Sequence, residues 1–159
     1  MEWIFKLPKE LAVMVVGMLP VFELRGAIPL GFYLNLDIFR TFIFAIIGNL
    51  IPVIPILFFL RSLSESLHRF FIFRRFFNWL FEYTSKRTEI IQKYEAAGLA
   101  IFVAIPLPFT GAWTGAIAAS LFQIRFRYAF LAISLGVLIA AILVTCLCIL
   151  GKLSWQVIK

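Results

Sequence analysis

The sequence predicts an all-α integral membrane protein built from two inverted repeats. Each repeat is expected to be a re-entrant helical hairpin followed by a transmembrane helix, and an amphipathic cytoplasmic helix joins the two. First, the 159 residues are 63% hydrophobic and 14% charged, against about 45–50% and about 25% in soluble domains. Second, two uncharged runs are long enough to cross a bilayer, and two other apolar stretches are interrupted at their centres. Third, each half of the chain contains one interrupted apolar stretch followed by one uninterrupted apolar run.

This composition excludes several classes of protein. A chain this short cannot bury so much apolar surface in a soluble core, so we do not expect a soluble enzyme. The net charge of +7 does not indicate nucleic-acid binding, because the basic residues lie at the ends of apolar segments and in one central stretch. Residues 1–159 are expected to form a single membrane domain.

The first repeat is predicted over residues 11–60. Residues 11–36 are apolar except at their centre, where Glu23 and Arg25 separate two halves. Each half is shorter than the ~20 residues that a helix needs to cross a bilayer. This favours a re-entrant hairpin, whose backbone must be surrounded by protein or water; the alternative is an ordinary kinked helix. Residues 41–60 follow as an uncharged span.

Within the span 41–60, two features are expected to affect the helix. Pro52 and Pro55 should kink it. Asn49 places an amide among apolar residues, so it needs a partner inside the protein.

An amphipathic helix is predicted over residues 61–95. Charged and polar residues recur there every three or four positions, opposite a set of phenylalanines. Such a helix would lie in the cytoplasmic headgroup layer, where its arginines meet anionic lipid.

The second repeat is predicted over residues 96–151. Residues 96–124 carry no charge, but the string IPLPFTGAWTG breaks their centre with prolines and glycines. A second re-entrant hairpin is therefore expected, again with a kinked helix as the alternative. Residues 128–151 form the second span.

The two halves align without a gap when the sequence is shifted by 88 residues. Ten of the 44 positions from 11 to 54 are then identical, among them Leu19-Pro20 with Leu107-Pro108 and Gly48 with Gly136. One crossing lies between the hairpins, so the second unit should be upside down relative to the first. In transporters of this design the substrate site lies at the repeat interface near mid-membrane.

The basic residues predict the orientation. Nine Lys and Arg residues fall on the side of the central segment and five on the side of the termini. By the positive-inside rule, residues 61–95 should be cytoplasmic and both termini outside, in a multi-pass protein of the cell (inner) membrane.

Glu23 and Arg25 are the two charges predicted deep in the membrane. Burial disfavours the charged form of a carboxyl, so Glu23 could exchange a proton near neutral pH and serve in proton coupling. Arg25 keeps its charge, and would pair with Glu23 or bind an anionic group. The alternatives are a pair that only holds the hairpin together, or an ELRG segment that lies at the membrane surface.

The second break supplies the other candidate residues. Hydroxyls and an indole N–H lie beside glycines there, and a half-helix starting near Thr110 would direct its positive end toward the centre of the membrane. The predicted substrate-binding residues are Arg25, Asn49, Pro108, Thr110, Gly111, Trp113, Thr114 and Gly115. Arg125 and Arg127 are predicted to bind anions at the interface. We expect no catalytic residues, no metal and no cofactor.

The strings LPVFELRGAIPLGFYLNL and IPLPFTGAWTG resemble the small multidrug export family over residues 11–150. The architecture is also similar to DedA-type membrane proteins, a likeness that implies dependence on the proton-motive force and translocation of lipid carriers such as undecaprenyl phosphate. Glu23 matches by position a glutamate that matters in that group. The arginine that those proteins place in the second hairpin has no counterpart in IPLPFTGAWTG.

We therefore expect a proton-coupled secondary transporter that moves a small amphiphilic substrate, as small multidrug exporters do. One alternative is a DedA-like flippase for an anionic lipid such as a polyprenyl phosphate. A second is a membrane scaffold that transports nothing. The expected partners are membrane lipid, the substrate and protons, with a homodimer as a reasonable assembly and no nucleic acid.

Overall fold

The computed structural model describes residues 7–59, 89–107 and 110–157, and these are helical with no strand among them. The first half contains α1 (Lys9–Met18), α2 (Glu23–Tyr33) and α3 (Ile38–Leu50). The second half contains α6 (Glu89–Ala104), α7 (Ala112–Leu121) and α8 (Phe126–Val157). The prediction of an all-α protein is confirmed over this part of the chain.

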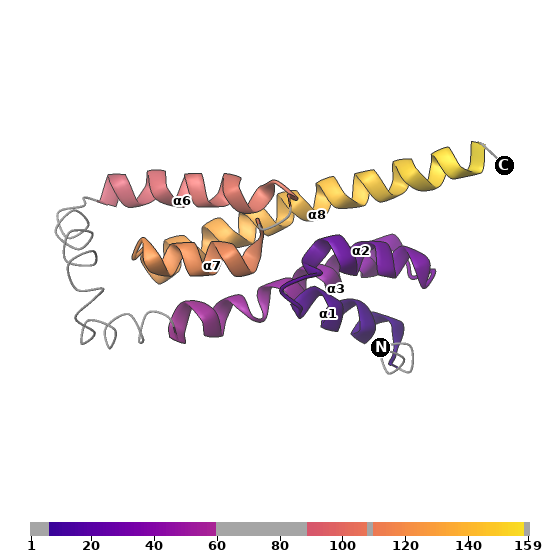
Figure 1. The fold of residues 1–159 in the computed structure, drawn as a ribbon, viewed down its shortest axis with the longest axis horizontal. Coiled ribbons are helices and arrows are strands. Elements are labelled where there is room, and N and C mark those ends of the chain that lie inside the picture. The colour runs from indigo at the N-terminus through magenta and orange to yellow at the C-terminus, as the bar shows by residue number, and fades with distance from the viewer. Residues whose placement is uncertain (1–6, 60–88, 108–109, 158–159) are drawn as a thin grey trace.

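Two hairpins enter the molecule from opposite ends. Helices α1 and α2 form one hairpin and α6 and α7 form the other, and Figure 1 shows the tips of both near the middle of the long axis. Helices α3 and α8 run lengthwise beside them. The two turns therefore lie near the middle of the molecule, where Glu23 and Ala112 beside them are buried while Val21 and Leu107 stay exposed on the outer surface.

The lengths of the helices match the predicted division into half-helices and spans. Helix α2 has 11 residues, so it is about 16 Å long and cannot cross a ~30 Å hydrocarbon core. Two helices are long and apolar enough to cross, Ile38–Phe59 and Phe126–Lys152. They contain almost all of the predicted spans 41–60 and 128–151.

The first of these spans is interrupted near Pro52. Helix α3 ends at Leu50, a turn follows at 51–52, and residues 53–59 are helical again. Pro52 has no N–H to donate to the carbonyl four residues earlier, and its ring crowds that carbonyl. The predicted break is therefore found at Pro52, whereas Pro55 lies inside the helical segment 53–59.

The predicted amphipathic helix 61–95 lies mostly outside the described residues. Its last part, from Glu89, belongs instead to α6, which continues without a break into the second hairpin. The first arm of that hairpin therefore begins inside the segment that the sequence analysis gave to the linker.

The two halves repeat each other in detail at the predicted separation of 88 residues. Helices α3 and α8 begin at residues 38 and 126. The turns before them contain Asn35 with φ 52° and Gln123 with φ 54°, two left-handed residues 88 positions apart. Asn35 donates its N–H to Phe32 O, and Gln123 donates its N–H to Ser120 O, both at 3.2 Å. The same turn is thus built twice.

Glycine lets each long helix approach the first arm of its own hairpin. A Cβ at Gly48 of α3 would collide with the carbonyl oxygen of Met14 in α1, and one at Gly136 of α8 would collide with that of Ala100 in α6. These two glycines are also 88 residues apart.

We expect Gly48→Ala to destabilise the protein by about 1–3 kcal/mol, because the added methyl meets a backbone atom that cannot rotate away. Gly98→Ala is the matched control, since nothing lies within 4 Å of a Cβ there and alanine favours a helix by about 1 kcal/mol. Thermal unfolding in lipid nanodiscs measures both. Equal melting temperatures for the two variants would contradict the close approach of α1 and α3.

Candidate functional site

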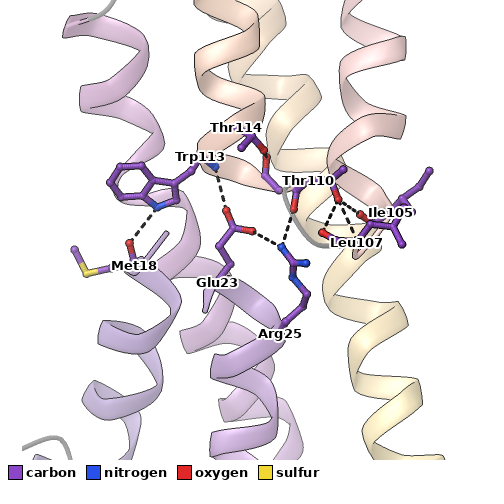
Figure 2. A network of polar contacts seen from close by, with 9 residues as sticks. Met18, Glu23, Arg25, Ile105, Leu107, Thr110, Trp113 and Thr114 are labelled. Carbon is purple, nitrogen blue, oxygen red and sulfur yellow. Dashed lines mark hydrogen bonds and ion pairs between the residues drawn. The ribbon is translucent and has the colours of Figure 1, made fainter. Parts of the chain in front are cut away.

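Glu23 is the buried acidic residue at the meeting point of the hairpin tips. It begins α2 and is 5% exposed. Its Oε1 accepts a hydrogen bond of 3.2 Å from the backbone N–H of Trp113, in the first turn of α7 (Figure 2). The positive end of α7 therefore faces the carboxylate, which stabilises negative charge there.

Arg25 reaches from α2 to the second hairpin as well. Its Nη2 donates to the backbone oxygen of Thr110 at 2.9 Å and lies 3.7 Å from Oε2 of Glu23 (Figure 2). One side chain thus joins the acidic residue of the first hairpin to the loop of the second. The predicted pairing of Glu23 with Arg25 is found.

Trp113 makes the converse contact. Its indole Nε1 donates to the backbone oxygen of Met18, at the end of α1, at 3.1 Å (Figure 2). Arg25 and Trp113 are 88 residues apart, so each hairpin presents a side-chain donor from the equivalent position to a carbonyl at the other tip. We call these two hydrogen bonds the tip contacts.

The backbone is unusual at a second equivalent pair. Glu23 has φ 45°, a left-handed conformation that is uncommon for residues other than glycine. Gly111, 88 residues later, has φ 156° and ψ −168°, a region that is essentially restricted to glycine. A Cβ at Gly111 would collide with the carboxylate of Glu23. The acid thus occupies the space that a side chain at its counterpart would need.

The two threonines of the second break bond to their own loop. The hydroxyl of Thr110 donates to Ile105 O at 2.6 Å and accepts from the N–H of Leu107 at 3.1 Å, while that of Thr114 donates to Gly111 O at 3.3 Å. In this conformation they shape the turn, and the backbone oxygen of Thr110 is the atom that meets the other hairpin.

A small cavity lies between the hairpins and the two long helices. Its volume of about 10 Å³ is enough for a single water molecule. Its lining includes three pairs of residues that are 88 positions apart: Glu23 with Gly111, Leu24 with Ala112, and Asn49 with Val137. The cavity therefore lies where the two repeats meet.

The polar groups of this cavity come mainly from the first repeat. Glu23 and Asn49 have the counterparts Gly111 and Val137, which are small or apolar, and Arg25 has Trp113. The two walls of the cavity thus differ in chemistry even though their backbones correspond.

A comparison with protein families finds a match over residues 23–143. The family is described as "putative small multi-drug export protein". The chain belongs to this family. A comparison with curated proteins and one with solved structures found no match. The matched region begins at Glu23 and contains all the cavity-lining residues up to Ala140.

Membership of the small multi-drug export family agrees with the two long apolar helices, and the chain is a membrane protein. The description of the family is that of an export protein rather than an enzyme. Within the described residues, no three His, Cys, Asp or Glu side chains gather where they could hold a metal ion.

In this member of the family, Gly115, Pro108, Arg125 and Arg127 take no part in the tip contacts. Gly115 packs against Val103 of α6, and Pro108 lies outside the described residues. Arg125 and Arg127 are exposed near the start of α8, beyond the far end of α7, which is about 15 Å long. Met18 was not predicted, since it takes part through its backbone oxygen, which no sequence motif identifies.

Proposed function

We propose that this protein exports a small amphiphilic substrate across the membrane by opening and closing the site between its two repeats, with Glu23 carrying the coupled proton. The observation that carries the proposal is the placement of Glu23 and Arg25, a buried pair of opposite charges, at the contact of the two hairpin tips. An ion pair that only stabilised the first hairpin would not need hydrogen bonds to the second hairpin, which both of these residues make.

The repeated layout supports alternating access. Hairpins that enter from opposite ends, beside two long helices, correspond to inverted-topology repeats in which the site lies between discontinuous helices. In such a protein the two repeats exchange conformations, so that the site opens to one side of the membrane and then to the other. With this topology both chain ends lie on one side, which we propose is the outside.

The conformation described here fits a closed state of that cycle. Pockets that bind small molecules have volumes of about 300–1,000 Å³, whereas this cavity has room for about one water. A substrate can enter only after the tips separate, and separation breaks both tip contacts.

The two walls of the cavity favour an amphiphile as substrate. The polar wall of the first repeat would face the polar group, and the apolar wall of the second would face the hydrocarbon part. The guanidinium of Arg25 already bonds to Thr110 O and lies beside Glu23, so an anionic headgroup would have to displace both partners. We therefore place export of a neutral or cationic amphiphile ahead of flipping an anionic lipid.

The test is flux in proteoliposomes under an imposed pH gradient, with a lipophilic cationic drug and a polyprenyl phosphate as the two substrates. We expect the drug to move in a gradient-dependent way. Movement of the lipid alone, without need of a gradient, would replace the proposal with a flippase. No movement of either compound would contradict transport of both classes and favour a scaffold.

The tip contacts give a separate prediction. Trp113→Phe keeps an aromatic ring but removes the donor to Met18 O, a bond worth about 1 kcal/mol. The open state should then be about fivefold more populated. The rate at which a hydrophobic carbodiimide labels Glu23 measures this population, because the reagent needs access to the carboxyl.

Tyr94→Phe is the control for this variant, since it removes a donor from a ring that is 77% exposed on α6. We expect it to label at the wild-type rate. If Trp113→Phe also labels at that rate, the contact does not hold the tips closed.

A further inference from the structure

Asn49 has a buried amide oxygen without a protein partner. The residue lies in the last turn of α3 and is 1% exposed. Its Oδ1 is fully buried and accepts no hydrogen bond from the protein. Buried acceptors in proteins are almost always paired, with protein or with an ordered water, so this oxygen indicates a ligand that donates hydrogen bonds.

The surroundings of Asn49 restrict what that ligand is. Asn49 lines the cavity of about 10 Å³ together with Glu23 and Arg25, which are the charged residues in its lining. The volume is close to the lower limit for one water molecule. The guanidinium of Arg25 in the same wall disfavours a metal cation.

The equivalent position in the second repeat shows that a polar side chain is not needed for packing. Val137 occupies it, lines the same cavity and is fully buried. The fold therefore accepts an apolar residue at this place. The amide at position 49 adds a hydrogen-bond acceptor that Val137 does not have.

We propose that the cavity is a binding site for a single water molecule that donates one hydrogen bond to Asn49 Oδ1 and the other toward the carboxylate of Glu23. This water is the species through which Glu23 gains and loses its proton: the water passes one of its protons to the carboxylate while its oxygen accepts a proton from the side that is open, so that a water molecule is restored, and release runs in reverse. The inference rests on the proposed function because it concerns the same carboxyl, but its test needs no transport.

The test measures hydrogen–deuterium exchange at the Glu23 carboxyl in the full chain reconstituted in lipid. Infrared difference spectra after transfer into D₂O follow the carboxyl band, which Glu23→Gln identifies by removing it. We expect Asn49→Leu, which is close in shape but lacks the acceptor, to slow this exchange by about tenfold or more, as an added barrier of about 1.4 kcal/mol does. Asn49→Val, which copies position 137, replaces it if the leucine variant does not fold.

Val53→Ala is the matched control. Val53 is fully buried in the same span as Asn49 but does not line the cavity, so the exchange of this variant should match that of the wild type. If Asn49→Leu exchanges at the wild-type rate and melts at a higher temperature, the proposal is overturned. That result would mean that the amide of Asn49 is buried without any partner.

A second arm distinguishes water from a cation. The melting temperature of the wild type is compared in sodium chloride and in choline chloride at equal ionic strength, and we expect no difference. A rise specific to sodium that Asn49→Leu abolishes would overturn the assignment to water. Absence of transport in proteoliposomes would contradict the proposed function, but it would not affect the result of the exchange experiment.

Discussion

Glu23→Gln is expected to reduce gradient-driven flux to the level of liposomes without protein, while the protein remains folded. Glutamine keeps the shape of the side chain, and its amide oxygen can still accept from the N–H of Trp113, where Oε1 now accepts at 3.2 Å. What it cannot do is take up and release a proton. A secondary transporter that carries its proton at this position should therefore lose coupling completely.

The matched control is Glu10→Gln. Glu10 pairs with Arg40 at 3.3 Å on an exposed surface, and such pairs contribute about 0–1 kcal/mol. We expect normal flux from this variant. If Glu23→Gln transports as well as Glu10→Gln does, with the pH gradient still required, Glu23 is not the proton carrier.

Gly111→Ala is expected to cause a large loss of stability. The backbone at this position costs a residue other than glycine about 1–3 kcal/mol, and the new Cβ would also displace the carboxylate of Glu23 from its place. Both the melting temperature and the flux should fall.

A double variant separates these two causes. Glu23→Ala removes the carboxylate that the new methyl would meet, but it leaves the backbone strain at position 111. Gly111→Ala should therefore be less destabilising in the Glu23→Ala background than in the wild type, by a double-mutant cycle on unfolding free energies. Additive effects would mean that Gly111 and Glu23 do not meet as described.

Much of the fold can be predicted from this sequence because its signals are local. A charged ELRG segment and a string with two prolines, each inside an apolar stretch, fix the two breaks, and run length identifies the two long helices. The start of α6 could not be located, since residues 89–95 carry charges that separate them in composition from the apolar stretch after 96, although the helix is continuous there. Helix propensity continues across this change of composition.

The candidate site was predictable only in part. Glu23 and Arg25 are evident as charges among apolar residues, and the repeat places them near the second break. Their partners are backbone groups of Thr110 and Trp113. Every residue has backbone groups, so the sequence gives no signal that marks these two. Arg125 and Arg127 have the right charge but lie beyond the far end of α7. They are close to the second break in sequence, but the whole length of α7 separates them from it in space.

The contact between Glu23 and Gly111 bears on how such a protein could arise. A symmetrical pair of identical half-length chains would bring position 23 of each subunit into the same space, so two carboxylates would meet and only one could ionise. When the two halves belong to one polypeptide, equivalent positions can carry different residues. Glu23 then supplies the carboxylate, and Gly111 leaves space for it. Covalent fusion thus permits a chemical asymmetry that a symmetric homodimer of half-length chains cannot have.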